Sequence, residues 1–550
     1  MTAHPHTRAL RTLLCFARMS SRSGRRRVWT LSTLCAAIIQ LGAQAMASPP
    51  PTSAPQVRAH AENLKGEYST RYPSVAIFKG IPYAQPPLGA LRWHAPQPTT
   101  PRHGPQTATD FAAACYQDSY NTAWYQRLAD SFGAAPNTFS DPVFSEDCLY
   151  LNVWTPALHS AYPRPVMVFI HGGSNKAGWS FEANYQADAL AALGDVVVVS
   201  VGYRLGIFGF FGHPEIAPGV ARANFGLLDQ IAALTYVHQA IAAFGGDPAN
   251  VTVFGESAGG EDIGYLITSP LAHGLIRRAI IQSGGFVLRE HATLADAEQL
   301  GRTLSKALPE THTLATLRRL SSDTLFRAAQ RALLEHDYMP VLDGYSVLKT
   351  PYAALREPLP IDLLIGSNQN ESYMYLTPDA NAYEADLQAL PVTTQAALRA
   401  FSGTERTAQL QHDRLNTFVD MACPTYVYAD AVTKSGRRAW VYRFNRIRAG
   451  DGAQRVLAYH GAELPYVFNT HDAWLPTDDA DRALGIAMLR YWSAFARTGD
   501  PNAAGLAVWP VYDRHAPKVI TLDVPSVASE AADRALCLSL APALYGAADH

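Results

Sequence analysis

Short, continuous apolar runs recur along the chain between about residues 165 and 445. A continuous run, unlike strict alternation, is typical of a strand that is buried on both faces of a parallel sheet. The runs that predict strands are Met167–Ile170, Val196–Val201, Val251–Phe254, Ala279–Ile281, Ile361–Ile365 and Trp440–Phe444.

Stretches with a helical pattern lie between these runs, most clearly Phe225–Phe244 and Ala480–Ala496. Alternating strands and helices predict an α/β fold, with helices on both faces of an open, mostly parallel sheet. Two less apolar regions, 286–340 and 372–420, also have a helical pattern. We interpret them as cap elements at the carboxyl ends of the strands, where ligands of such sheets bind.

The first fifty residues differ in pattern from the rest. Residues 1–47 contain seven arginines and no acidic residue, and an apolar run from Val28 to Leu41 is followed by Ala45-Met46-Ala47. This order is typical of a secretory signal peptide, and the run is too short for a bilayer, which needs about 20 residues. An uncleaved membrane anchor is the alternative. We expect an exported protein, periplasmic or extracellular, with no stable membrane insertion once the leader is removed.

Details of this leader stay open. Met19 is an alternative start, and Arg25-Arg26-Arg27 resembles a weak twin-arginine export signal, so export by either the general or the twin-arginine route fits. Residues 48–58 are rich in proline and predict a linker.

Composition narrows the class of protein. The 550 residues are 48% hydrophobic and 17% charged, which indicates a globular chain and excludes collagen-like, disordered and disulfide-dense small proteins. The net charge is −2, and it becomes −9 without the seven arginines of the leader. Nucleic-acid binding needs a basic face, so we expect no nucleic-acid partner.

One serine follows a predicted strand in the pattern of a nucleophile. Val251–Phe254 leads into Gly255-Glu256-Ser257-Ala258-Gly259, a Gly-x-Ser-x-Gly turn with helix-compatible residues after it. At such a turn the backbone of the serine is strained, and a side chain at either glycine would collide with neighbouring elements. An ordinary turn serine is the alternative, which the preceding strand disfavours.

A serine hydroxyl needs a base and a carboxylate that orients the base. With this turn the chain order is serine, acid, histidine. Glu371 follows the run Ile361–Ile365, and His460 lies in a loop beside Gly461. Other histidines and carboxylates downstream fit the same order, so the pattern alone leaves the choice open.

A second glycine-rich turn, His171-Gly172-Gly173-Ser174, follows the run Met167–Ile170. Consecutive small residues let backbone N–H groups point at one spot, as a developing oxyanion requires. A plain Gly-Gly turn is the alternative, and the presence of Ser257 in the same sheet favours the oxyanion site.

Several segments together resemble the type-B carboxylesterase and cholinesterase family. The signature pair is Gly255–Gly259 and the segment 146–154, Glu-Asp-Cys-Leu-Tyr-Leu-Asn-Val-Trp. Further segments follow in the family's order: Gly80–Gly89, Tyr203–Gly209, Asn224–Gln230, Phe244–Pro248 and Ile281–Gly284. The resemblance covers about residues 60–540 and implies a single α/β-hydrolase domain, 59–545, with helical caps.

The same resemblance implies a secreted serine carboxylesterase that hydrolyses small carboxylic esters through an acyl-enzyme, without a metal or an organic cofactor. It leaves the oligomeric state open. The triad would be Ser257, Glu371 and His460, and the oxyanion would be held by the backbone N–H groups of Gly173, Ser174 and Ala258.

Four cysteines remain outside the leader: Cys115, Cys148, Cys423 and Cys537. An even number in an exported chain suggests disulfides, in three possible connectivities, and four unpaired thiols are the alternative. The resemblance implies the pairs Cys115–Cys148 and Cys423–Cys537.

Three departures from the family limit this transfer. Ser174 replaces the third glycine of a Gly-Gly-Gly turn. Asp262 stands where a serine is often found, close to Glu261 and Glu256, and these carboxylates are either buried partners of His460 or partly solvent-facing.

The third departure concerns the Cys115–Cys148 loop, which has Asn137-Thr138 where cholinesterases place a tryptophan, while Trp124 is far from that position. Without an aromatic face for a quaternary ammonium group, we rank choline esters below general carboxylic esters. Two alternatives remain: an esterase specialised for one natural phenolic, toxin or lipid ester, and a non-catalytic binding homologue.

Overall fold

The computed structural model describes residues 53–158, 160–218, 221–289, 292–309, 313–333, 336–471 and 474–546. The predicted signal peptide lies outside the described residues, as does the first part of the predicted linker. Strand β1 (Gln56–Ala59) begins inside the range 48–58, so the linker ends earlier than predicted. The reason is that Val57 and Ala59 alternate with exposed residues and are buried against the core.

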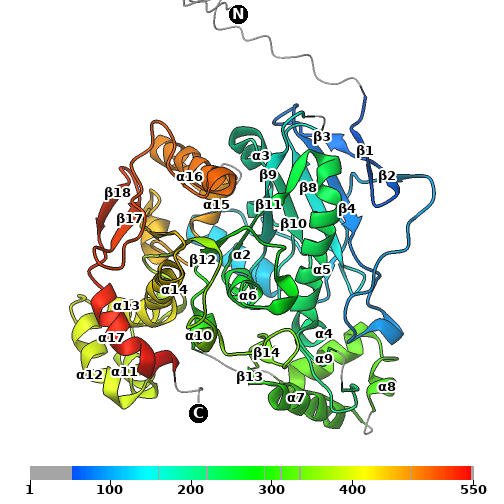
Figure 1. Ribbon diagram of the computed structural model, residues 1–550. Helices are drawn as coiled ribbons and strands as arrows, with labels where there is room; N and C mark the ends of the chain where they lie inside the picture. The colour runs from blue at the N-terminus through cyan, green and yellow to red at the C-terminus, as the bar shows by residue number, and fades with distance from the viewer. Residues whose placement is uncertain are drawn as a thin grey trace, which may run out of the picture. The chain divides into compact units, whose positions relative to one another are not determined.

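An eleven-stranded sheet runs through the described part of the chain (Figure 1). The strands from β10 to β17 pair in parallel, and antiparallel strands extend the sheet at both margins. In spatial order they are β18 (Val527–Glu530), β17 (Lys518–Leu522), β16 (Ala439–Phe444), β15 (Asp362–Asn368), β12 (Arg278–Gln282), β11 (Gly246–Glu256), β9 (Arg164–Ile170), β10 (Val197–Val201), β8 (Tyr150–Thr155), β4 (Ala76–Pro82) and β3 (Glu67–Tyr68).

The apolar runs correctly predicted the parallel centre of this sheet. All six became strands, and these strands, β10, β9, β11, β12, β15 and β16, are consecutive neighbours. They are detectable because both of their faces are buried. Strand β18 has four exposed residues, so no apolar run marks it.

Successive residues of a central strand pack into two different cores. Val168 of β9 belongs to one cluster with Leu234 of α5 (Phe225–Ala240). Phe169 belongs to the other, with Trp492 of α16 (Asp479–Thr498). Both predicted helices are therefore present on opposite faces, and the end of the first continues as a 3₁₀ turn, Ile241–Phe244.

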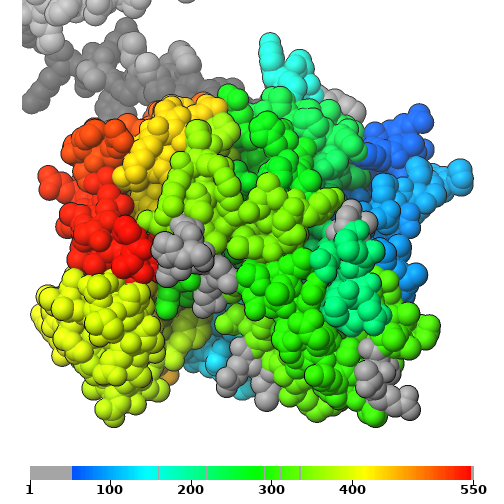
Figure 2. Space-filling model, turned by 60° about the horizontal axis from the view of Figure 1, so that its bottom comes forward, coloured from blue at the N-terminus to red at the C-terminus, as the bar shows by residue number. Residues whose placement is uncertain are grey.

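The two regions predicted as caps are helical. The first contains α7 (Leu294–Ala307), α8 (Leu314–Leu317) and α9 (Ser322–Ala332), and the second contains α11 (Ala380–Ala389), α12 (Val392–Ser402) and α13 (Ala408–Thr417). Figure 2 shows them as separate green and yellow blocks on one face of the molecule.

The remaining α-helices, and the strands that belong to the smaller sheets, complete the described part of the chain. They are α2 (Tyr120–Ser131), α3 (Asp188–Gly194), α4 (Gly206–Gly209), α6 (Ala258–Leu266), α10 (Pro351–Ala354), α14 (Cys423–Lys434), α15 (Leu464–Phe468), α17 (Arg534–Tyr545), β2 (Glu62–Lys65), β5 (Pro105–Thr107), β6 (Ala114–Cys115), β7 (Phe144–Ser145), β13 (Ala292–Thr293) and β14 (Val341–Leu342). None of the helices in the described ranges is both long and apolar enough to cross a bilayer.

Two disulfides cross-link the described chain. Cys115 and Cys148 close a loop that contains α2, and Cys423 joins α14 to Cys537 of α17. This is the pairing that the family resemblance implied.

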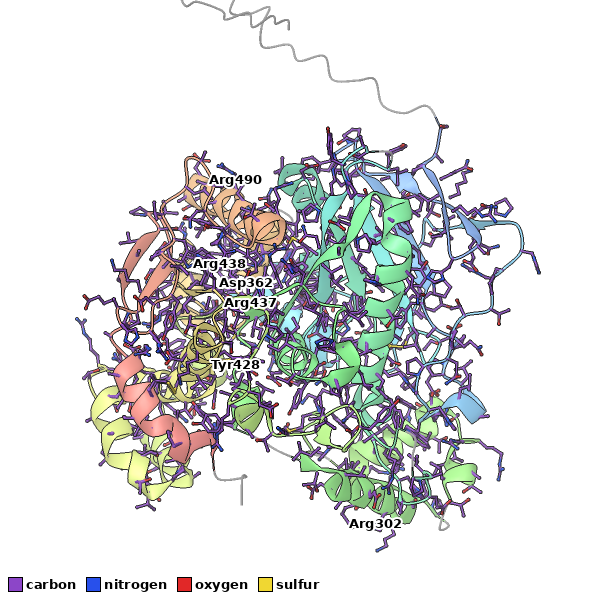
Figure 3. All side chains as sticks on the ribbon, viewed as in Figure 1. Arg302, Asp362, Tyr428, Arg437, Arg438 and Arg490 are labelled. Carbon is purple, nitrogen blue, oxygen red and sulfur yellow. A yellow bond between two sulfur atoms is a disulfide. The ribbon has the colours of Figure 1, made fainter. Side chains whose placement is uncertain are left out.

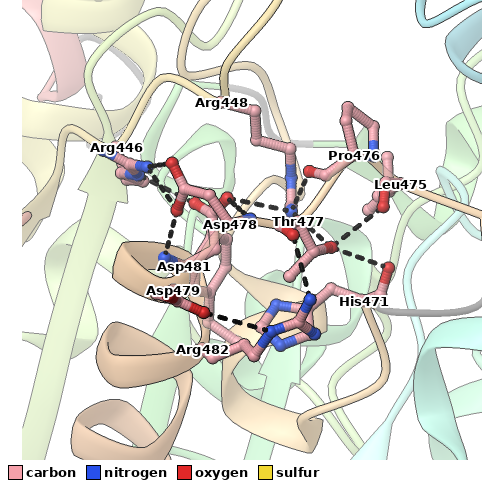
Figure 4. Close-up of polar contacts among 11 residues, drawn as sticks. Arg446, Arg448, His471, Leu475, Pro476, Thr477, Asp478, Asp479, Asp481 and Arg482 are labelled. Atoms are coloured by element: carbon pink, nitrogen blue, oxygen red, sulfur yellow. Dashed lines mark hydrogen bonds and ion pairs between the residues drawn. The ribbon is translucent and has the colours of Figure 1, made fainter.

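Ion pairs lie at both ends of the central strands. At the amino ends of β15 and β16, Asp362 lies 3.5 Å from Arg438 (Figure 3). Beyond the carboxyl end of β16, Arg446 donates to Asp478 and Asp481 at the start of α16 (Figure 4). Asp481 also accepts a hydrogen bond from Tyr466 of α15 at 2.7 Å. This second network anchors both ends of the segment that carries His460.

Candidate active site

Ser257 occupies a strained position between β11 and α6. Its backbone has φ 56° and ψ −130°, outside the favourable regions for a residue with a side chain. A Cβ atom on Gly259 would lie 2.1 Å from the carbonyl oxygen of Ile170, and one on Gly255 would lie 2.7 Å from it. The two glycines are therefore required by close backbone packing, which confirms the argument made from the sequence.

Glu371 and His460 are in direct contact. Oε2 of Glu371 lies 2.6 Å from Nδ1 of His460, although the two residues are 89 positions apart. Oε1 accepts hydrogen bonds from the Ser283 hydroxyl at 2.7 Å and from the Asn368 N–H at 2.5 Å. The carboxylate is thus held on one side and aimed at the imidazole on the other.

The opposite ring nitrogen of His460 faces another carboxylate. Nε2 lies 3.3 Å from Oε1 of Glu256, the residue before Ser257. Among the described residues, no hydrogen bond joins Ser257 to His460, but both line the same cavity. Such contacts are often long in an enzyme without substrate and tighten when it binds.

These carboxylates change the acidity of the pair. Burial raises the pKa of Glu256, although the nearby His460 favours the charged carboxylate and opposes the shift. Burial disfavours the charged imidazolium, but Glu256 and Glu371 outweigh this and raise the pKa of His460 above that of an ordinary histidine. The proton of His460 is therefore retained to a higher pH than usual.

The second glycine-rich turn lies against the serine. A Cβ atom on Gly172 would lie 2.9 Å from Cβ of Ser257. Gly173 has φ 103° and Ser174 has φ 54°, so the chain turns through left-handed backbone here. Within the described residues, neither of their N–H groups donates a hydrogen bond to the protein. Ala258 begins α6, and N–H groups of a first helical turn have no partner inside the helix.

A cavity of about 390 Å³ joins these groups. Ser257, Glu371, His460, Gly173 and Ser174 all line it. Ala258 is not among the lining residues and is buried behind the serine. The arrangement combines a serine hydroxyl on strained backbone, an imidazole bound to a carboxylate and backbone N–H donors, and these are the groups that acyl transfer requires.

Comparisons with known proteins agree with this geometry. The model of the carboxylesterase family matches residues 53–537. The chain belongs to this family. The para-nitrobenzyl esterase of Bacillus subtilis (strain 168) is 34% identical over 81% of this chain and 91% of its own length. Carboxylesterase 1D of Rattus norvegicus is 32% identical over 84% of this chain and 89% of its own.

Solved structures extend the similarity to the fold. A structure of PNB esterase, 31% identical, covers 88% of this chain and all of its own, with a TM-score of 0.75. A carboxylesterase of Geobacillus stearothermophilus, 30% identical, covers 89% and 99% with the same TM-score. The protein therefore has the α/β-hydrolase fold and is a carboxylic ester hydrolase.

The cavity of this carboxylesterase has an aromatic wall that the sequence analysis did not expect. Trp124 of α2 lines it, and its Nε1 donates to the Tyr375 hydroxyl at 2.6 Å, with Tyr120 beside them in the lining. Asn137 and Thr138, which stand where cholinesterases have a tryptophan, are not among the lining residues of this cavity. Helix α2 instead brings a tryptophan to the cavity from a different place in the loop.

The three carboxylates near Ser257 have different surroundings. Glu256 is a buried neighbour of His460, and Glu261 is partly exposed in the cavity lining. Asp262 is fully buried away from His460, between Asn175 and Gln230. Glu256 is therefore a buried partner of His460, Glu261 is partly solvent-facing, and Asp262 is neither.

Two buried carboxylates were missed from the sequence. Glu463 accepts hydrogen bonds from Gln282 at 2.8 Å and from Asn368 at 2.7 Å, behind the Glu371–His460 pair. Its position three residues after His460 was the available signal. Glu182, which accepts a hydrogen bond from Asn121 and lines the cavity, had no such signal in the sequence.

No group of three or more potential metal ligands occurs in the described ranges.

Proposed function

We propose that this enzyme hydrolyses small carboxylic esters by two-step acyl transfer, with Ser257 as nucleophile, His460 as base and Glu371 as orienting acid. The observation that carries the proposal is the 2.6 Å contact between Glu371 and His460 in the cavity where the strained Ser257 lies. Glu371 holds Nδ1, so that Nε2 is the nitrogen available for proton transfer.

In the first step, Nε2 of His460 takes the proton of Ser257, and Oγ forms a bond to the ester carbonyl carbon. The carbonyl π electrons move to oxygen, where the N–H groups of Gly173, Ser174 and Ala258 stabilise the negative charge. The carbon–oxygen bond to the alcohol then breaks, and His460 returns the proton to the departing alcohol. Water repeats the sequence on the acyl-enzyme and releases the acid and Ser257.

Glu256 takes part by stabilising the imidazolium that forms when His460 accepts the proton of Ser257. The carboxylate lies 3.3 Å from Nε2 of His460, so the imidazole must turn from Glu256 toward Ser257 to accept this proton.

Replacement Glu256→Gln is expected to move the acidic limb of the kcat/KM profile to lower pH by about 1–3 units. The base works only when neutral, so activity is lost as the pH falls through the pKa of His460, and removing the neighbouring charge lowers that pKa. The measurement is hydrolysis of p-nitrophenyl acetate between pH 5 and 9. Asp337→Asn, an exposed carboxylate of the cavity rim, is the control and should leave the limb in place. An unchanged limb in Glu256→Gln would refute the role of Glu256.

An organophosphate such as diethyl p-nitrophenyl phosphate tests the proposed nucleophile directly. We expect stoichiometric release of p-nitrophenol and a diethylphosphoryl adduct on the peptide that contains Ser257, found by mass spectrometry. Only a serine that is activated by a neighbouring base reacts readily with an organophosphate, so a binding homologue without catalysis would remain unlabelled. An adduct on another serine would assign the nucleophile elsewhere.

A second candidate is an esterase specialised for an aromatic ester, favoured by the Trp124–Tyr375 wall of the cavity. Benzyl acetate should then exceed cyclohexylmethyl acetate in kcat/KM by at least about tenfold, because the two leaving alcohols are similar in size and acidity and differ in the aromatic ring; equal values would favour the general esterase.

We also propose export with cleavage after Ala47, for which amino-terminal sequencing of the mature protein should begin at Ser48. The two disulfides fit an oxidising compartment.

A further inference from the structure

Asp262 is a buried carboxylate that the proposed mechanism does not use. It lies in α6, five residues after Ser257, and is 0% exposed. Oδ1 accepts a hydrogen bond from Nδ2 of Asn175 at 3.1 Å, and Oδ2 accepts one from Nε2 of Gln230 at 2.5 Å. Neither partner is a cation. Burial raises the pKa of Asp262 to about 7, as expected for a carboxyl group that amides alone compensate.

Asn175, the first partner of Asp262, belongs to the oxyanion turn, by which we mean the glycine-rich turn 171–175 whose N–H groups are the proposed oxyanion donors. Asn175 directly follows Ser174, and its backbone has φ 53°, so two successive residues with side chains adopt left-handed backbone. This conformation is unfavourable for L-residues and persists only where the surroundings impose it.

Contacts of Asn175 supply that constraint from several directions. Its carbonyl oxygen accepts the Gly206 N–H at 2.7 Å, and its Oδ1 accepts from the Tyr203 hydroxyl at 3.2 Å. Nδ2 of Asn175 donates a hydrogen bond to Asp262, and this bond connects the turn to α6, the helix that begins directly after Ser257. The contact joins the two halves of the reacting site across 87 residues of sequence.

We propose that Asp262 is a positioning residue for the oxyanion hole, which it holds in place by binding the side chain of Asn175. The inference rests on the proposed function, since it assigns a catalytic use to the N–H groups of Gly173 and Ser174. With Asp262 present, the left-handed turn keeps these donors aimed beside Ser257. Without it, Asn175 loses a buried acceptor and the turn relaxes away from the ester oxygen.

The main test compares Asp262→Ala with Asp262→Asn on p-nitrophenyl acetate. Asp262→Ala should lower kcat by about ten- to a hundredfold, because misplacement of catalytic donors by an ångström has an effect of this size. KM should stay within about twofold. Asp262→Asn should retain kcat near the wild-type value, because its Oδ1 still accepts from Asn175 and its amide can donate to Gln230 once the Gln230 amide turns.

A trifluoromethyl ketone provides a readout that a structural role alone would not move. Its adduct with Ser257 carries an oxyanion, so its affinity should fall in Asp262→Ala by the same factor as kcat/KM. All rates are expressed per active site titrated with the organophosphate, which removes any effect of partial folding. Asp430→Ala, which removes another buried carboxylate, bonded to Tyr512 and Arg534 outside the cavity, is the matched control. It should lower thermal stability and leave kcat per titrated site unchanged.

A second variant keeps the proposal testable if Asp262→Ala does not fold. Asn175→Gly removes the side chain and tolerates the left-handed backbone, so it should fold and lose kcat by a similar factor. Because both residues act through one contact, the double variant should lose no more than the worse single variant.

Three results would overturn the inference: unchanged kcat in folded Asp262→Ala or Asn175→Gly, equal losses in Asp262→Asn and Asp262→Ala, or additive losses in the double variant. Failure of the proposed function has a different signature, because the wild-type protein would then neither hydrolyse the ester nor react with the organophosphate.

Discussion

Replacement of Ser257 by alanine should reduce turnover of p-nitrophenyl acetate by at least about 10⁴-fold, to the level of the uncatalysed reaction plus residual transition-state binding. No acyl-enzyme can form without the hydroxyl, and the remaining His460–Glu371 pair has no group to activate in the first step. The measurement is the initial rate at saturating substrate, with the fold checked by circular dichroism and thermal unfolding.

Ser539→Ala, at an exposed position of α17, is the matched control and should retain full turnover. The fold of Ser257→Ala should survive, since the substitution removes a single oxygen atom at a cavity surface. Substantial turnover by folded Ser257→Ala would mean that another group attacks the ester and would remove the basis of the proposed mechanism.

Removal of the Cys423–Cys537 disulfide should have the largest effect on stability. The bond spans 114 positions, and the chain-entropy model gives about 4–5 kcal/mol for a loop of this size, as an upper estimate. The double variant Cys423→Ala/Cys537→Ala should therefore show a clearly lower midpoint in guanidinium denaturation. Activity per titrated site should be unchanged, because neither cysteine lines the cavity.

The other disulfide supplies the comparison. Cys115 and Cys148 are separated by 33 positions, so the same model gives a loss about 1 kcal/mol smaller for their removal. Equal midpoints for the wild type and the Cys423/Cys537 variant, or a greater loss from the shorter loop, would contradict the entropic explanation.

Much of the fold was predictable because its centre is encoded locally. The runs that became β9, β10, β11, β12, β15 and β16 are mostly apolar, since helices cover both faces of these strands. The marginal strands are short or partly exposed, and their pairing partners decide that they are strands. Strand β1 shows the same effect, because the pairing of Val57 with Leu64 orders a segment whose composition indicates a linker.

In the candidate site, too, some residues were predictable from the local sequence and others only from the fold. The turn around Ser257 was predictable from five adjacent residues, because the Gly-x-Ser-x-Gly pattern is continuous in the chain, although the backbone that requires its glycines is that of Ile170 in β9. Glu371 and His460 were selected through family resemblance, and the chain order alone left other histidines and carboxylates open. Their 2.6 Å contact depends on how β15 and the loop after β16 meet in space.

By itself, the sequence determined the buried parallel strands and marked the serine turn and the glycine-rich turn, since runs of apolar or small residues are visible in consecutive positions. Only the tertiary structure decided which groups the site combines: Glu256 against His460, Trp124 in the cavity wall and Asp262 bonded to Asn175. The physical reason is that burial and hydrogen bonding depend on what packs against a side chain. For these residues the deciding neighbours are distant in sequence.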